Sequence, residues 1–228
     1  MRILAIILLL TAAVPSLHAE EPALSRRERK DLTAKLPEAH RQFLLDVGAI
    51  MIDTERDTFL RMETDAQREM FIDDFWRRRD AARGTTNFAA KDEYYAHLEF
   101  VKDEFGQAGS DRGRIYLIQG PPTAIIDIDC SRYYVPMQVW RYERLPEFGQ
   151  DFRLLFYVPR DQRGYRLWTA MGDEERAYND LIANGVESTG RHPQNVVFDC
   201  PNGEELATAL AMMNMDKLRL HKLYHPPP

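Results

Sequence analysis

The spacing of the apolar residues changes close to residue 110 of this 228-residue chain, and the change limits the folds that the chain can adopt. Before that point apolar residues recur at steps of three and four, the period of a helix with one buried face. Helices are therefore expected from Pro37 to Met51, from Ala66 to Arg79 and from Phe88 to Phe105. Pro37 suits a first helical turn, because a backbone N–H there has no partner within the helix.

Short runs rich in β-branched and aromatic residues follow, separated by Gly, Pro, Asp or Arg. They are Arg114–Gln119, Thr123–Ile128, Met137–Tyr142, Phe152–Val158 and Tyr165–Trp168. This length and composition are typical of strands. Residues 161–164 are expected to form a hairpin connection with Gly164 at positive φ. No helical pattern separates the runs, so the sheet should be mainly antiparallel.

Helical patterns return after the strands. A helix is expected from Asp173 to about Gly185, and Asn202 with Glu205 has the spacing of a capping box at the start of a last helix. The order of helices, antiparallel sheet and helices predicts an α+β fold. Large aromatic residues at helical or strand spacing usually lie in the core. This expectation covers Trp76, Tyr94, Tyr95, Trp140 and Trp168.

The amino terminus has the pattern of a secretory signal peptide. Arg2 is followed by the unbroken apolar run Ile3–Leu10, and Ala19 lies at a plausible cleavage position. The apolar run is too short to span a bilayer comfortably. We therefore expect residues 1–19 to be removed, leaving a periplasmic or secreted protein with no transmembrane span. An uncleaved membrane anchor is the alternative.

Charge and cysteine content exclude several classes of protein. The chain has 30 Lys and Arg against 36 Asp and Glu, interspersed along its length. This argues against a nucleic-acid partner held by bulk electrostatics. Cys130 and Cys200 are too few for a zinc site or a disulfide scaffold, and no metal or cofactor is expected. In an exported chain they are expected to form one disulfide, with two free thiols as the alternative.

Two charged clusters are candidates for function. The segment Arg77–Asp80 either faces the carbonyl groups at the end of its own helix or helps to hold a carboxylate- or phosphate-bearing ligand. Arg112 and Arg114 would project to one face of the expected strand, and Asp111 would cap the turn before it. A solvated charged edge is the alternative. The candidate functional surface is Arg77, Arg78, Asp80, Asp111, Arg112 and Arg114.

The segment "DRGRIYLIQGPP" (111–122) resembles the core signature of the GWxTD domain family of exported bacterial proteins. "FWRRRD" (75–80) and "DEYYAHLEFVKDEF" (92–105) resemble its helical lead-in, and "PMQVWRY" (136–142) and "FRLLFYVPRDQRGYRLW" (152–168) its later strands. The namesake motif is degenerate here: residues 107–111 read QAGSD, in which only Asp111 is identical and Ser110 keeps the hydroxyl of Thr. The resemblance implies an exported domain and no defined reaction.

The sequence also predicts a division of the chain, in which the resemblance covers residues 65–170. A signal peptide (1–19) would precede a helical region (20–64), a GWxTD-like α+β domain (65–170) and a helical extension (171–228).

Two functions follow from the sequence. The first is a non-enzymatic interaction or envelope-associated module, with an envelope protein as its possible partner. The alternative is a hydrolase-type enzyme with a site near Asp111, Arg112, Arg114 and Asp127; Asp127 and Asp129 share one face of a strand and could form a carboxylate pair. A closed cleft with convergent polar groups would favour the enzyme, and a shallow face with aromatic and arginine residues would favour partner binding.

Overall fold

The computed structural model describes residues 22–171, 174–183 and 193–225, and its elements follow the order helices, sheet, helices. The first helices are α1 (Arg26–Lys35), α2 (Glu38–Asp46), α3 (Asp53–Arg61), α4 (Asp65–Arg83), α5 (Ala89–Phe105) and α6 (Asp111–Gln119). The strands are β1 (Ala124–Ile128), β2 (Met137–Leu145), β3 (Gly149–Tyr157) and β4 (Arg166–Leu167). The last elements are α7 (Glu174–Leu181), the 3₁₀ helix η2 (Pro193–Asp199), α8 (Gly203–Met212) and α9 (Lys217–Tyr224). The expected α+β class is confirmed. The expected signal peptide lies outside the described residues.

The sheet has the strand order β1-β2-β3-β4, and every neighbouring pair is antiparallel, as the sequence predicted. Val139 of β2 lies opposite Ile126 on one side and Leu155 on the other. Side chains alternate between the two faces of a strand, so this row lies on one face and the row through Trp140 lies on the other. The antiparallel sheet therefore presents two packing faces.

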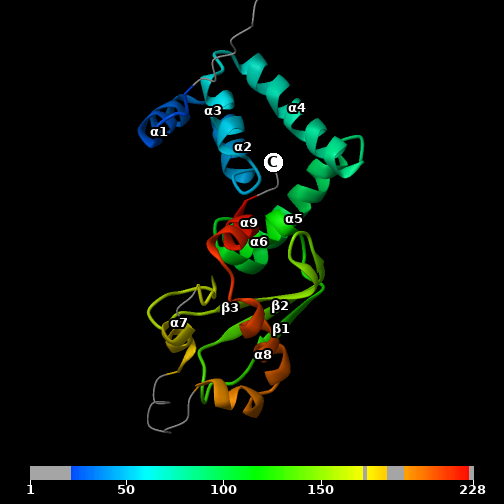
Figure 1. Ribbon diagram of the computed structural model, residues 1–228. Helices are drawn as coiled ribbons and strands as arrows, with labels where there is room; N and C mark the ends of the chain where they lie inside the picture. Colours follow the sequence, from blue (N-terminus) through cyan, green and yellow to red (C-terminus); the bar gives the residue numbers. More distant parts are fainter. Residues whose placement is uncertain (1–21, 172–173, 184–192, 226–228) are drawn as a thin grey trace, which may run out of the picture.

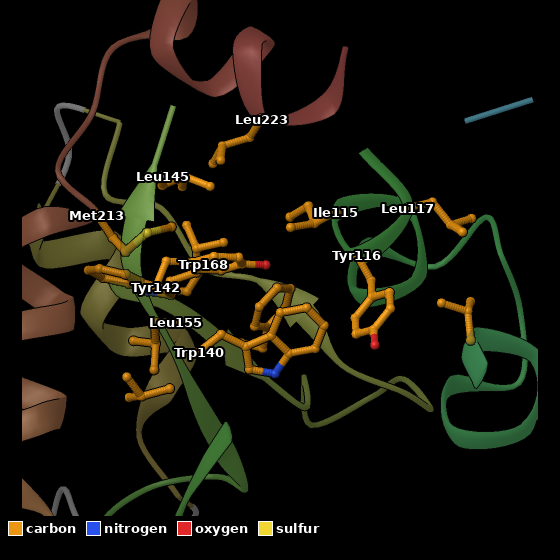
Figure 2. Close-up of a cluster of buried hydrophobic side chains, with 14 of the residues drawn as sticks. Ile115, Tyr116, Leu117, Trp140, Tyr142, Leu145, Leu155, Trp168, Met213 and Leu223 are labelled. Atoms are coloured by element: carbon orange, nitrogen blue, oxygen red, sulfur yellow. The ribbon is translucent and has the colours of Figure 1, made fainter. Parts of the chain in front are cut away.

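Helices cover both faces of the sheet (Figure 1). Phe105 at the end of α5 and Tyr116 of α6 contact Trp140 with ring centroids 5.4 and 6.2 Å apart. On the opposite face, Glu205 of α8 forms an ion pair with Arg153 of β3 at 2.5 Å. Figure 2 shows Ile115 and Tyr116 extending from α6 toward Trp140, while Leu223 enters the same core from α9.

Helices α2, α3 and α4 pack around the amino-terminal part of the core. Phe43, Phe59, Phe71 and Phe75 contact one another from α2, α3 and α4, with ring centroids 5.4 to 6.3 Å apart. In Figure 1 these helices lie away from the sheet, and α5 runs between the two regions. Trp76, Tyr94, Trp140 and Trp168 are buried as expected, and Tyr95 is half-buried. No helix among the described residues has the length and apolar character needed to cross a membrane.

The expected strand over Arg114–Gln119 is wrong, because this run forms most of α6. Ser110 caps the helix: its Oγ accepts a hydrogen bond from the Gly113 N–H at 3.1 Å. Gly120 ends the helix at φ +81° and donates its N–H to the Tyr116 carbonyl. A short, continuous apolar run has no period that separates a strand from a buried helix, and here burial against α5 and the sheet decides the outcome.

Two expectations for the last helices are also corrected. Asn202 adopts φ +57° and makes no side-chain cap for α8; its Nδ2 donates instead to the Asp127 carbonyl at 3.3 Å. Glu205, the other half of the expected capping box, pairs with Arg153. α7 ends at Leu181, before the predicted Gly185, and Asp173 lies outside the described residues. Tertiary partners thus replace the local caps.

The cysteines are paired as expected. Cys130, just after β1, is joined to Cys200, just before α8, with Cα atoms 5.4 Å apart. The disulfide therefore connects an edge of the sheet to the helix that covers one of its faces.

Candidate functional site

A cavity of about 290 Å³ lies between the start of α6 and the connection from β3 to β4. Its walls include Ser110, Asp111, Arg112, Arg163, Tyr165 and Arg166, and we call it the arginine pocket. Gly164, at φ +89°, turns the β3–β4 connection as the sequence predicted. This turn places Arg163 and Arg166 in the same cavity as Arg112.

Arg112 is held in one orientation by contacts on both sides of its guanidinium. The guanidinium carbon lies 4.5 Å from the ring centroid of Phe105 and 4.2 Å from that of Tyr165. Its Nη1 donates to Gln138 Oε1 at 3.0 Å, and Gln138 Nε2 donates to Asp127 Oδ1 at 2.9 Å. Burial lowers the pKa of Arg112 from its ordinary value, but a guanidinium stays protonated at neutral pH. The pocket thus contains a positive charge whose position is fixed by the side chains around it.

Asp111 joins three elements at the edge of the pocket. Its Oδ2 accepts a hydrogen bond from the Leu167 N–H of β4 at 2.8 Å. It also faces Tyr224 of α9: burial, followed by the charge of Asp111 and a hydrogen bond to it, raises the pKa of that phenol. The predicted capping role belongs to Ser110 instead, and Asp111 connects α6 to the sheet and to the last helix.

Arg114 points away from the pocket. Residues two apart on a helix are separated by about 200° around its axis, so Arg112 and Arg114 cannot share a face. Arg114 Nε donates to the Tyr224 carbonyl at 3.0 Å, and Gln119 Nε2 donates to the carbonyls of Lys222 and Leu223. Arg114 therefore supplies a hydrogen-bond donor to a carbonyl at the end of α9. The expectation that Arg112 and Arg114 project to one face is wrong.

Arg163 and Arg166 are pocket residues that the sequence analysis did not identify. Both are exposed, and neither forms an ion pair within the described part of the chain. The available signal was their position beside the turn residue Gly164, in the connection between two predicted strands. With Arg112 they give the pocket three guanidinium groups against one carboxylate, Asp111.

The cluster Arg77–Asp80 serves the packing of the first helices. Arg78 and Arg79 pair with Glu55 of α3 at 3.2 and 2.9 Å, and Arg79 stacks 3.3 Å from the ring centroid of Phe75. Arg77 is exposed and lies 3.8 Å from Asp73. These contacts lie within α3 and α4, so the structure does not bring the cluster into one site with Arg112.

Asp80 is buried at the junction of α4 and α5. Its carboxylate accepts hydrogen bonds from Phe88 N–H at 2.7 Å, Ala90 N–H at 2.8 Å and Thr85 Oγ1 at 2.8 Å. The Ala90 bond, with those from Thr85 and Phe88, lowers the pKa of Asp80 below its usual value. Its role is to hold the start of α5 against the end of α4.

Asp127 and Asp129 line a cavity of about 230 Å³, and Tyr165 lines both this cavity and the arginine pocket. Asp127 is exposed on β1 and engaged by Gln138, whereas Asp129 lies beyond the end of the strand. The structure thus connects Asp127 to Arg112 through one amide side chain. The arrangement orients the guanidinium of Arg112.

Comparisons of the chain with family models, with curated proteins and with solved structures found no match. The resemblance to the GWxTD family therefore gains no support from them. Function must be argued from the geometry of the site.

Proposed function

We propose that this protein is an exported, non-enzymatic interaction module of the cell envelope, which holds an acidic group of its partner in the arginine pocket. The observation that carries the proposal is Arg112, fixed between Phe105 and Tyr165 and tied to Gln138. A guanidinium that is already ordered loses little side-chain freedom when it binds, so more of the interaction energy appears as affinity. Its planar donors match a carboxylate or phosphate group in a bidentate geometry.

Arg163 and Arg166 supply the rest of the attraction. They are exposed and without an ion-pair partner among the described residues, so an incoming anion competes with no carboxylate that already occupies them. Charges at the mouth of a site raise the rate of encounter and determine which partners are rejected. The arginine–aromatic character of the pocket supports partner binding.

A hydrolase that uses Asp111, Arg112, Arg114 and Asp127 is the alternative. All four of these groups already have hydrogen-bond partners in the described chain: Asp111 accepts from Leu167, Arg114 donates to Tyr224, and Gln138 connects Arg112 with Asp127. These contacts explain the side chains without catalysis and favour the binding module.

Export is supported by the Cys130–Cys200 disulfide, because such bonds persist in oxidising compartments. Cleavage after Ala19 would give a mature chain that begins at Glu20. Amino-terminal sequencing of the protein from its host's envelope fraction should find this end. Recovery of intact Met1 from the cytosol would contradict export.

Membership of the GWxTD family remains part of the proposal. The support is the order of several sequence blocks, of which "DRGRIYLIQGPP" forms α6 and the turn after it. The proposal predicts that in a typical member the Thr of the namesake motif caps a helix, as Ser110 does here, and that the following Asp binds a strand N–H. A member structure with a strand in this place would contradict it.

Capture of partners from envelope extract tests the function. The purified protein and its Arg163→Gln/Arg166→Gln variant would be immobilised, and the retained proteins compared by mass spectrometry. The matched control is Arg26→Gln/Arg144→Gln, which removes the same charge from two exposed arginines outside the pocket. We expect the pocket variant alone to lose a captured protein. Equal capture by all three proteins, or hydrolysis of an envelope component by the purified protein, would refute the proposal.

A further inference from the structure

A second and larger cavity adjoins the arginine pocket. It has a volume of about 560 Å³ and lies between the β3–β4 connection and α7. Asp111 and Arg166 line both cavities, so the two hollows meet at these side chains. A ligand held in the arginine pocket can therefore extend into the larger cavity past Arg166.

The larger cavity has a small excess of negative charge, because Asp111, Asp161 and Asp180 line it together with Arg160 and Arg166. Asp161 and Asp180 come from the β3–β4 connection and from α7, and neither forms an ion pair among the described residues. Arg160 also lines it, but the Nε of this arginine donates to the Ile182 carbonyl at 2.8 Å and its Nη2 to the Asn179 carbonyl at 3.3 Å. These bonds fix the guanidinium of Arg160 at the end of α7, where it keeps its positive charge, so the described side chains that line the cavity carry three carboxylates against two guanidinium groups.

Tyr157 also lines this cavity, and the charged groups around it change the pKa of its phenol. Burial raises the pKa of its phenol, and the charges of Asp180 and Asp111 raise it further, whereas Arg166 opposes them. An ammonium or guanidinium group in this cavity could pair with Asp161 or Asp180, neither of which has an ion-pair partner among the described residues, and could donate to the phenol oxygen of Tyr157. A second acidic group would be repelled there.

We infer that the ligand of the arginine pocket is a peptide segment of mixed charge, with an acidic side chain in the arginine pocket and a basic side chain in the larger cavity. This inference rests on the proposed function and names the chemistry of its partner. Specificity arises because the two cavities place opposite charges next to each other, so a segment of the wrong charge order meets repulsion at both positions.

Peptide titrations of the purified protein test the inference by calorimetry. The probes are capped peptides that contain one Glu and one Lys joined by glycine spacers of increasing length. Two matched probes replace either the Lys or the Glu by Gln, and inorganic phosphate is a further probe. We expect the best mixed-charge peptide to bind about tenfold or more tightly than either single-charge peptide, and its affinity to fall as salt is added.

Variants assign each charge to its cavity. Arg163→Gln should weaken binding of the mixed-charge peptide and of the peptide that keeps only Glu. Asp161→Asn/Asp180→Asn should weaken binding of the mixed-charge peptide to the level of the Glu-only peptide, and should leave binding of the Glu-only peptide unchanged or stronger. Circular dichroism and thermal unfolding would show that these exposed substitutions preserve the fold.

The outcomes separate the inference from the proposed function. Equal affinity for the mixed-charge and Glu-only peptides, tighter binding of phosphate, or failure of every mixed-charge peptide to bind would overturn the inference. If pocket-dependent capture from the envelope extract persists in those cases, the proposed function stands with a different acidic ligand. If the Arg163→Gln/Arg166→Gln variant captures the same envelope proteins as the parent, the proposed function itself is refuted.

Discussion

Gly113 is the residue of α6 where one added methyl group should have the largest effect. A Cβ at this position would lie 2.5 Å from the Gln107 carbonyl oxygen and 2.8 Å from Val101 Cγ1. Neither neighbour can move easily, because Gln107 O accepts hydrogen bonds from Ser110 and Val101 is fully buried in α5. The start of α6 must therefore shift away from α5 in Gly113→Ala.

The expected cost follows from two opposing effects. Overpacking a filled site costs about 1–3 kcal/mol, whereas replacing Gly by Ala within a helix gains up to about 1 kcal/mol. The overpacking should prevail, and we expect the free energy of unfolding of Gly113→Ala to fall by about 1–2 kcal/mol. For a chain of this size the melting temperature should fall by roughly 2–8 °C.

Urea unfolding followed by tryptophan fluorescence would measure the change, because Trp140 is buried beside α6. Gly109→Ala is the matched control: it lies in the same segment, and no heavy atom lies within 4 Å of its added Cβ. Its stability should stay within about 0.5 kcal/mol of the parent protein. A Gly113→Ala protein as stable as the parent would refute the close packing of α6 on α5.

Three further predictions concern stability. The free energy of unfolding of Cys130→Ser/Cys200→Ser should be about 4 kcal/mol lower than that of the parent, because the bond closes a loop of 70 residues and so reduces the entropy of the unfolded chain. Two reactive thiols in the unreduced, denatured parent would contradict the bond. Asp111→Ala should lower the free energy of unfolding, measured in urea, by about 1–3 kcal/mol, because the Leu167 N–H loses its acceptor. Unchanged stability with lost partner capture would show that Asp111 acts in binding instead. The hydrogen bond from Arg29, aided by the Leu24 N–H, lowers the pKa of Asp57 below its ordinary 3.8, so its stabilising effect should be full above about pH 4 and lost as the pH falls through the lowered value. Melting temperatures of the parent and Asp57→Asn from acid to neutral pH should diverge in this way, and parallel curves would count against the pair.

The class of the fold and most of its elements could be read from the sequence, because their information is local. The runs Met137–Tyr142 and Phe152–Val158 are short and rich in β-branched and aromatic residues, and both lie largely in strands of the structure. The disulfide could be inferred as well, since two cysteines allow only one pairing within the chain.

Local information failed where a segment's partner lies far along the chain. Arg114–Gln119 has the composition of a strand, but it became a helix because its apolar side chains pack between α5 and the sheet. Asn202 and Glu205 have the spacing of a capping box, but their side chains bind Asp127 and Arg153 of the sheet instead. Contacts with distant residues outweighed the local preference in both cases.

The arginine pocket shows the same limit for function. The sequence alone made Asp111 and Arg112 candidate functional residues, because charged residues beside a turn and an apolar run stand out locally. Only the tertiary structure decided that Arg114 points to α9, that Arg78 pairs with α3, and that Arg163 and Arg166 join Arg112. A binding site depends on which side chains meet in space, and that is determined by helix rotation and strand pairing over the whole chain, which the spacing of residues within one segment does not contain.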